Sequence, residues 1–259
     1  MDEYQAPENL LQDKVILITG AGSGIGRAAA LSYAAHGATV ILLGRTEEKL
    51  NAVYDEIEAA GYPQAAIITL NLETASETDF DNLAATLEQE FGRIDGILHN
   101  AGILGVRTPI ESYDPIIWQQ VMQVNVNSAF MLTQALLSLT NDSEDASIIF
   151  TSSGVGRTGK AFWGAYAVSK FATEGLMQVL ADELEHNPNI RVNAINPGAT
   201  RTDMRANAYP AENPESNPTP EEIMPLLLYM LGRDSRAVNG KSLNAQYTNQ
   251  TKNQTISHF

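Results

Sequence analysis

The chain has 259 residues with 16 basic and 31 acidic side chains, and its formal net charge of −15 argues against nucleic acid or an anionic membrane as a partner. The absence of cysteine excludes disulfide bonds, cysteine-ligated zinc and thiol catalysis, and the four scattered histidines argue against a metal site. No apolar run approaches the roughly 18 residues of a membrane-spanning helix, so we expect a cytoplasmic protein without a metal.

Short apolar runs alternate with amphipathic stretches from Lys14 onward. Because the runs are apolar almost throughout, they indicate strands buried on both faces of a parallel sheet. Between them, stretches such as the one that carries Leu50, Val53, Tyr54 and Ile57 show a single apolar stripe. The sequence therefore predicts an α/β fold, a single Rossmann-type doubly wound domain over residues 1–259. We expect strands at 15–19, 39–43, 66–70, 94–98, 147–151 and 190–195, an edge strand at 243–247 and a flexible tail at 247–259.

The first predicted strand runs into a glycine-rich turn, Thr19-Gly20-Ala21-Gly22-Ser23-Gly24-Ile25-Gly26, and then into an alanine-rich helix. Glycines let a pyrophosphate approach the backbone, and the helix N-terminus offers free N–H groups and a positive dipole end. The spacing departs from a strict G-x-G-x-x-G pattern, and a tight turn without a ligand is the alternative. The position after the first strand favours dinucleotide binding by Gly20, Ser23, Gly24, Ile25 and Gly26.

The second predicted strand ends in Gly44-Arg45-Thr46, where a site for NAD would carry an acidic residue. A guanidinium can pair with a 2′-phosphate, so Arg45 and Thr46 favour NADP(H), while NAD(H) remains possible. The alternative is that Arg45 pairs with Glu47 or Glu48 on the surface.

A serine follows the predicted strand 147–151, and Tyr166 and Lys170 open a helix that is expected to run to about His186. Tyr166 and Lys170 share one helix face, and a nearby ammonium is expected to lower the phenol pKa from about 10. Ser153 could hydrogen-bond a substrate carbonyl, and Tyr166 could exchange a proton with it. Each residue alone has a structural interpretation, but the three together favour catalysis.

In order and spacing, these motifs resemble the short-chain dehydrogenase/reductase family, over residues 14 to about 245. The motifs are the glycine turn, His99-Asn100-Ala101-Gly102, Asn125, Ser153 with Tyr166-x-x-x-Lys170, and Asn196-Pro197-Gly198 leading to Thr200 and Thr202. Finer features, such as 44–50 and 122–127, are similar to the bacterial YciK-type branch. The resemblance implies a seven-stranded parallel sheet and an oxidoreductase that interconverts a carbonyl and an alcohol.

The resemblance also implies roles for individual residues. Asn125 would hold a helix bend and a water that links Lys170 to solvent, and Lys170 would bind the nicotinamide ribose beside Tyr166. Asn71 and Leu72 would contact adenine, and Asn100, Ala101 and Gly102 would line the adenosine ribose. Pro197, Gly198, Thr200 and Thr202 would close over the nicotinamide.

Two residues depart from the family pattern. His99 stands where an asparagine is usual, and we interpret it as structural because no carboxylate or nucleophile is evidently paired with it. Asn71 replaces a common aspartate, which keeps an acceptor for adenine and adds a donor. Neither position touches the hydride chemistry.

The remaining predictions concern substrate and partners. Residues 207–220 contain Pro210, Pro214, Pro218 and Pro220, and we expect a long lid loop over 203–220, with a surface loop as the alternative. Phe162 and Trp163 could wall a pocket for a carbonyl substrate or serve packing. Apolar residues on several sides of the helices after Asp114 and Tyr166 indicate a partner, and the resemblance implies a homodimer or homotetramer built on those helices. A sensor or scaffold protein that binds NADP(H) with little catalysis is the alternative function.

Overall fold

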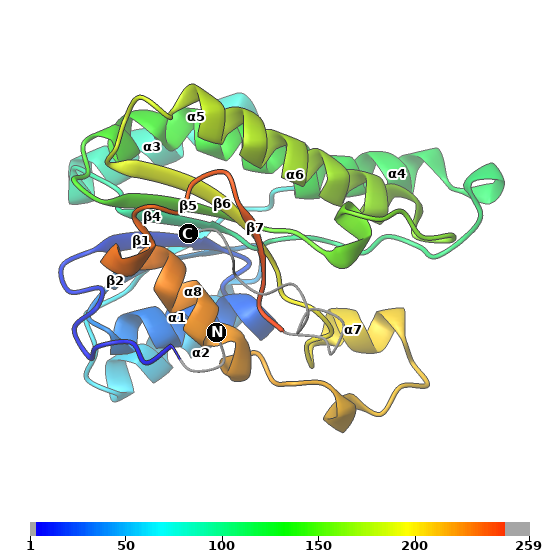
Figure 1. Cartoon of the computed structure of the whole chain (residues 1–259), viewed down its shortest axis with the longest axis horizontal. Helices are drawn as coiled ribbons and strands as arrows, with labels where there is room; N and C mark the ends of the chain where they lie inside the picture. Colours follow the sequence, from blue (N-terminus) through cyan, green and yellow to red (C-terminus); the bar gives the residue numbers. More distant parts are fainter. Residues whose placement is uncertain (1–3, 247–259) are drawn as a thin grey trace.

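Seven parallel strands form one sheet at the centre of the molecule (Figure 1), in a computed structural model that describes residues 4–246. The strand order is β3-β2-β1-β4-β5-β6-β7, so the chain reverses its direction of winding between β1 and β4. In such sheets ligands bind outside the carboxyl ends of the strands at this switch point. The strands are β1 Val15–Thr19, β2 Thr39–Gly44, β3 Ala66–Thr69, β4 Gly96–His99, β5 Ala146–Thr151, β6 Ile190–Asn196 and β7 Ser242–Asn244.

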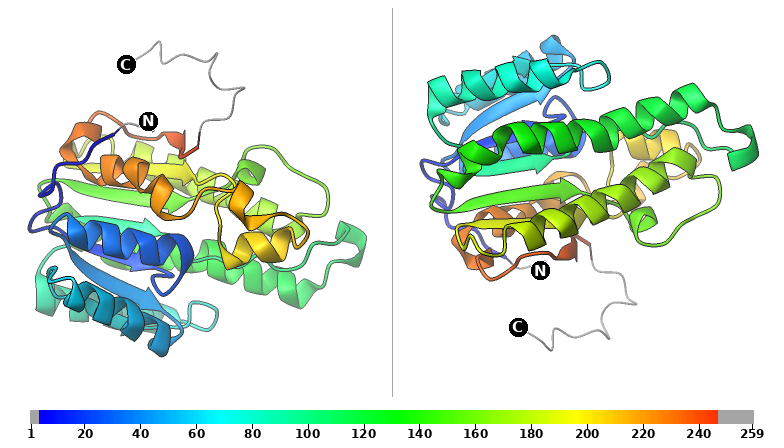
Figure 2. Two further views of the ribbon diagram at one scale, coloured as in Figure 1. Left: turned by 90° about the horizontal axis from the view of Figure 1, so that it is seen from below. Right: turned by 90° about the horizontal axis from the view of Figure 1, so that it is seen from above.

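Helices cover both faces of the sheet, as the prediction of a doubly wound domain requires (Figures 1 and 2). The helices α1, α2 and α8 lie on one face and α3, α5 and α6 on the other, while α7 lies beyond the carboxyl ends of the strands. The helices are α1 Gly24–Ala35, α2 Glu47–Ala59, α3 Glu77–Phe91, α4 Pro115–Met122, α5 Ser128–Asn141, α6 Gly164–Glu183, α7 Asp203–Ala208 and α8 Met224–Leu231.

Alternate residues of the central strands supply the two hydrophobic cores. Ile16 and Ile18 of β1 pack toward α1 and α8, and Leu17 between them packs toward α3, α5 and α6. All five residues of β1 are buried, because each face of the sheet meets a layer of helices. The apolar strand runs therefore predicted the architecture correctly.

Most predicted boundaries differ from the structure by one or more residues, as at the ends of β2, β3 and β6, and α6 ends at Glu183 rather than at about His186. β4 begins at Gly96 rather than residue 94, although the backbone of Asp95 already bonds both neighbouring strands, its N–H donating to the Val15 carbonyl at 2.8 Å and its carbonyl accepting from Ser147 N at 3.1 Å. β7 covers Ser242–Asn244, and the predicted tail at 247–259 lies outside the described residues. The predicted loop at 203–220 begins with helix α7, whose first turn is capped by the Thr202 hydroxyl at 3.2 Å from Arg205 N.

Candidate active site

Two adjoining cavities, of about 420 and 230 Å³, follow the carboxyl ends of the strands and share Gly20, Ser23, Ala101 and Gly102. They bring together most of the predicted site. The larger cavity is also lined by Gly24, Ile25, Asn100, Ser153, Tyr166, Lys170, Pro197, Gly198, Thr200 and Thr202, and the smaller one by Arg45, Thr46, Asn71 and Leu72. Gly26 and Asn125 lie behind these walls.

The glycine turn is shaped by close backbone approach. A Cβ on Gly26 would lie 2.2 Å from the Gly20 carbonyl oxygen, and Gly24 has a φ of +52°, so a side chain at either position would clash or strain the turn. Within the described residues, the N–H groups of Gly24, Ile25 and Gly26 have no hydrogen-bond partner. Three free donors at the start of a twelve-residue helix suit the pyrophosphate of a dinucleotide.

A threonine that the sequence reasoning missed joins this turn to the neighbouring loop. Thr19 Oγ1 accepts hydrogen bonds from Asn100 N at 3.0 Å and Ala101 N at 2.9 Å, and Asn100 Nδ2 donates to the Thr19 carbonyl at 3.2 Å. These bonds fix the ends of β1 and β4 against each other at the switch point. The available signal was a polar residue at the end of an otherwise apolar strand.

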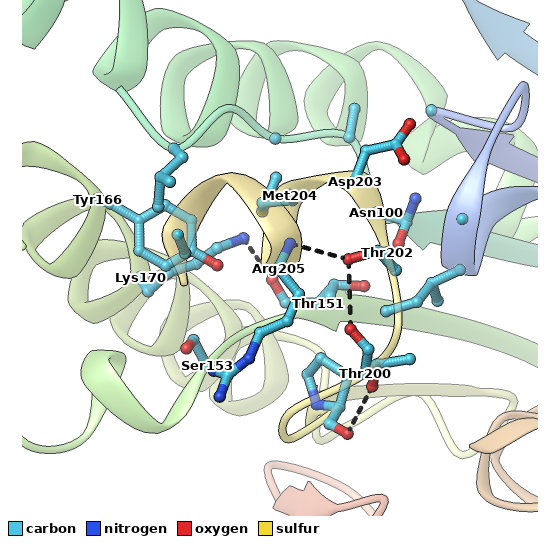
Figure 3. Close-up of a pocket in the computed structure, with 18 of the residues that line it drawn as sticks. Asn100, Thr151, Ser153, Tyr166, Lys170, Thr200, Thr202, Asp203, Met204 and Arg205 are labelled. Atoms are coloured by element: carbon cyan, nitrogen blue, oxygen red, sulfur yellow. Dashed lines mark hydrogen bonds between the residues drawn. The ribbon is translucent and has the colours of Figure 1, made fainter. Parts of the chain in front are cut away.

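The catalytic candidates meet where β5 ends and α6 begins (Figure 3). Ser153 follows β5, and Tyr166 and Lys170 are on the first turns of α6 with only 8% and 4% of their surface exposed. Lys170 Nζ donates to the Thr151 carbonyl at 2.7 Å and lies 5.6 Å from the centre of the Tyr166 ring. One buried base, one phenol and one hydroxyl therefore face the same cavity.

The pKa expected for Tyr166 was wrong in direction. Burial raises the pKa of Tyr166 to about 12, although a hydrogen bond with Ser153 acts in the opposite direction. Burial also lowers the pKa of Lys170 to about 8, against the charge of Glu174. Desolvation of the phenolate outweighs the hydrogen bond with Ser153, so Tyr166 is a neutral phenol at pH 7.

Asn125 lies in a π-helical turn, Gln123–Asn127, that separates α4 from α5. Its amide makes a two-way contact with Ile103: Oδ1 accepts from the backbone N at 2.8 Å, and Nδ2 donates to the carbonyl at 3.0 Å. Nδ2 also donates to Ser169 Oγ on α6 at 3.0 Å. Asn125 thus ties the interrupted helix to the loop after β4 and to the helix that carries Tyr166.

At the other end of the groove, Arg45 is exposed beside the smaller cavity, and no ion pair joins it to Glu47 or Glu48 within the described residues. Lys49, which the sequence reasoning did not select, lines the same cavity and adds a second cation. Asn71 Oδ1 accepts the Glu73 N–H at 3.2 Å, which engages its oxygen in the local turn.

His99 is buried in the layer behind the site. Its ring stacks on Phe150 at 4.6 Å between centroids, and Nε2 is 2.9 Å from the Thr133 hydroxyl. Burial lowers the pKa of His99 to about 3, so the ring is neutral at physiological pH. These contacts agree with a structural role.

Residues 4–246 contain neither a cluster of metal ligands nor a helix that could span a membrane. Within this range no three His, Asp or Glu side chains are grouped so as to hold a metal ion. No helix in it has the length and apolar character needed to cross a bilayer.

Known proteins share both the sequence and the fold. A family model described as short chain dehydrogenase matches residues 14–213. The uncharacterized oxidoreductase YciK of Escherichia coli K12 is 54% identical over 243 residues, which are 94% of this chain and 96% of that protein.

Two solved structures extend this similarity. A short chain dehydrogenase from Pseudomonas syringae is 62% identical with a TM-score of 0.93, covering 94% of this chain and 99% of the other. One from Escherichia coli CFT073, complexed with NADPH, is 54% identical with a TM-score of 0.91, covering 93% and 100%. The chain, with its Rossmann-type sheet and with its tyrosine and lysine at the start of α6, belongs to the short chain dehydrogenase family of oxidoreductases.

Proposed function

We propose that this protein is an NADP(H)-dependent oxidoreductase that interconverts a carbonyl and an alcohol, with Tyr166 as the acid and base. The observation that carries the proposal is the single cavity of about 420 Å³ that Ser153, Tyr166 and Lys170 share with the glycine turn. A donor of protons and a binding site for a dinucleotide thereby face the same space, as hydride transfer to a carbonyl requires.

The residues present fit a dinucleotide along the whole groove. The free N–H groups at the start of α1 would hold the pyrophosphate, and the Arg45 guanidinium, with Lys49 beside it, would pair with a 2′-phosphate. Asn100, Ala101 and Gly102 line the segment between them. A solved relative that is complexed with NADPH supports the same assignment. When bound, the cofactor supplies or accepts the hydride.

Residues of the chain itself would transfer the proton to and from the substrate oxygen. The Ser153 hydroxyl would donate to the substrate carbonyl oxygen and share its developing negative charge. Tyr166, neutral at pH 7, would break its O–H bond as the new O–H bond forms on the substrate. The phenolate left behind would be stabilised by the Lys170 ammonium.

We also propose that the protein is a homodimer or homotetramer that associates through α5 and α6. Phe130 on α5 is 47% exposed, and Phe171 and Val179 on α6 are 45% and 57% exposed. Large apolar side chains at this density on adjacent helices favour a partner surface. Sedimentation at micromolar concentration should give a mass of two or four chains, and a monomer would contradict the proposal.

The test of the enzymatic proposal begins with titration of the purified protein with NADPH and with NADH, followed by nicotinamide fluorescence. A panel of aldehydes, diketones and quinones is then followed by the nicotinamide absorbance. We expect NADPH to bind more tightly and at least one carbonyl to be reduced. Binding without turnover of any carbonyl would favour a sensor or scaffold protein, and no binding would refute the role of the glycine turn.

A further inference from the structure

The substrate side of the larger cavity has an apolar wall. Beyond Tyr166 it is lined by Leu104, Trp163, Met204 and Ala208, which pack together with Tyr209. The indole of Trp163 lies 5.7 Å from the Tyr166 ring between centroids. A substrate whose carbonyl reaches Ser153 and Tyr166 would therefore place its adjoining segment against this wall.

The cavity is also lined by a guanidinium. Arg205 on α7 lines the cavity, and Figure 3 shows its side chain running from α7 across the pocket toward the side that carries Ser153. Nε and Nη2 donate to the two oxygens of Glu212, each at 2.6 Å, which leaves Nη1 outside this ion pair. The guanidinium lies 4.0 Å from the Tyr209 ring centre. Arg205 is thus oriented for bidentate recognition of a carboxylate, with Glu212 as its present partner.

Other cations surround this position although the chain as a whole is acidic. Arg107 stacks on Trp163 and Tyr209 at 5.0 and 4.9 Å from the ring centres, and Lys160 donates to the Tyr209 hydroxyl at 3.3 Å. Arg201 also lines the cavity and donates to the Pro214 and Asn217 carbonyls at 3.0 and 3.3 Å. The carboxylates nearest along the same segment are Asp203 and the paired Glu212. Arg201 and Arg205 line the cavity together with Asp203, and Arg107 and Lys160 lie on the aromatic side chains beside it, so positive charge prevails there and favours a negatively charged ligand.

We infer that the substrate is a carbonyl or alcohol compound that carries a carboxylate group and an apolar segment. Arg205 binds the carboxylate in exchange for Glu212, and the apolar segment lies against Leu104, Trp163 and Met204. This inference rests on the proposed function, because it takes Ser153 and Tyr166 as the reacting end of the cavity.

The test compares matched ligands on the enzyme loaded with NADP⁺. Calorimetry measures the dissociation constants of hexanoate, hexanamide and hexylphosphonate, which share one chain and differ in the end group. We expect hexanoate to bind about tenfold more tightly than hexanamide, the effect of a charge-assisted contact. Equal affinities, no binding of hexanoate, or tighter binding of the phosphonate would overturn the carboxylate assignment.

Substitutions test whether the preference for hexanoate over hexanamide depends on Arg205. Arg205→Gln should reduce the preference for hexanoate over hexanamide to about twofold or less, whereas Glu212→Gln, which frees the guanidinium, should increase it. Arg233→Gln removes an equal charge from an exposed position after α8 and should leave the preference unchanged. A preference that survives in Arg205→Gln would contradict the assignment. Failure of NADP⁺ to bind would instead refute the proposed function, since that titration precedes the ligands.

Discussion

The two ends of the same sheet carry two polar clusters of opposite character. At the amino ends of the strands, the Asp145 carboxylate accepts hydrogen bonds from Lys14 and Arg191, each at 2.7 Å, and from Arg236 at 3.2 Å. At the carboxyl ends, the N–H groups that open α1 and the hydroxyls of Thr151 and Ser152 have no partner within the described residues.

Whether the polar groups of a cluster are already hydrogen-bonded distinguishes a structural cluster from a functional one more clearly than the types of residue in it. Both clusters are rich in charged and polar side chains, and both are largely buried. A cluster whose donors and acceptors satisfy one another contributes to stability and offers nothing to a ligand. A cluster with free, preorganised donors is suited to binding and catalysis.

The largest expected effect is on catalysis, from a substitution in the cluster at the carboxyl ends of the strands. Tyr166→Phe removes the proton donor and leaves the ring, so we expect kcat/KM to fall about a thousandfold. The affinity for NADPH should change little. Steady-state kinetics and fluorescence titration on the same preparation test both statements. Undiminished turnover would remove Tyr166 from the mechanism.

A substitution in the cluster at the amino ends of the strands should affect stability alone. Asp145→Asn leaves Arg191, which is 3% exposed, without its anion, and we expect the free energy of unfolding at pH 7 to fall by about 3 kcal/mol. Urea denaturation measures this loss. Glu144→Gln, an exposed neighbour, is the matched control and should change stability by less than about 0.5 kcal/mol.

The loss of stability in Asp145→Asn should depend on pH. Burial tends to raise the pKa of this carboxyl, but the Lys14 hydrogen bond and the Arg191 charge together lower it to about 2. A depressed pKa stabilises the fold above the unfolded value of 3.8, and this contribution is lost as the pH falls through about 2. The difference between wild type and Asp145→Asn should therefore shrink toward acid. A constant difference from pH 7 to pH 2 would contradict the assignment.

A smaller effect is expected at Arg45. Arg45→Ala should weaken NADPH binding about tenfold and NADH binding much less, because only NADPH carries the 2′-phosphate. Glu47→Gln is the control. If Arg45 served only to pair with Glu47 on the surface, Arg45→Ala and Glu47→Gln would change the affinity for the two cofactors in the same way. Equal loss of both cofactors would refute a phosphate contact.

The smallest effect is expected at His99. His99→Asn removes the stacking on Phe150 and changes the contact with Thr133, so we expect stability to fall by about 1 kcal/mol. The dependence of kcat/KM on pH between 5 and 8 should not change, because the ring is already neutral there. A shifted pH profile would indicate a part in proton transfer.

The sequence predicted the elements whose causes are local. The apolar runs of β1 and β2, the stripe of Leu50, Val53 and Ile57 on α2, and the glycine turn all follow from residue patterns that extend over a few positions. The spacing of Tyr166 and Lys170 likewise placed both on one face of α6.

Features that depend on surroundings were not predictable in this way. The raised pKa of Tyr166 results from its burial in the folded chain, which outweighs the hydrogen bond with Ser153. Helix α7 forms just before the proline-rich stretch, where Thr202 caps its first turn and Arg205 pairs with Glu212. Thr19 acquires its importance only when β1 and β4 become neighbours.

The π-helical turn at Gln123–Asn127 has a consequence for the tolerance of this segment to changes in length. An α turn takes about 3.6 residues and a π turn about one more, so the wide turn absorbs one extra residue and keeps α4 and α5 in register. Deleting one residue there would restore a regular helix and leave Phe130 on its face of α5, but it would remove the bulge that presents Asn125 to Ile103. Insertions and deletions between α4 and α5 should therefore be selected against more strongly than those in the exposed loops.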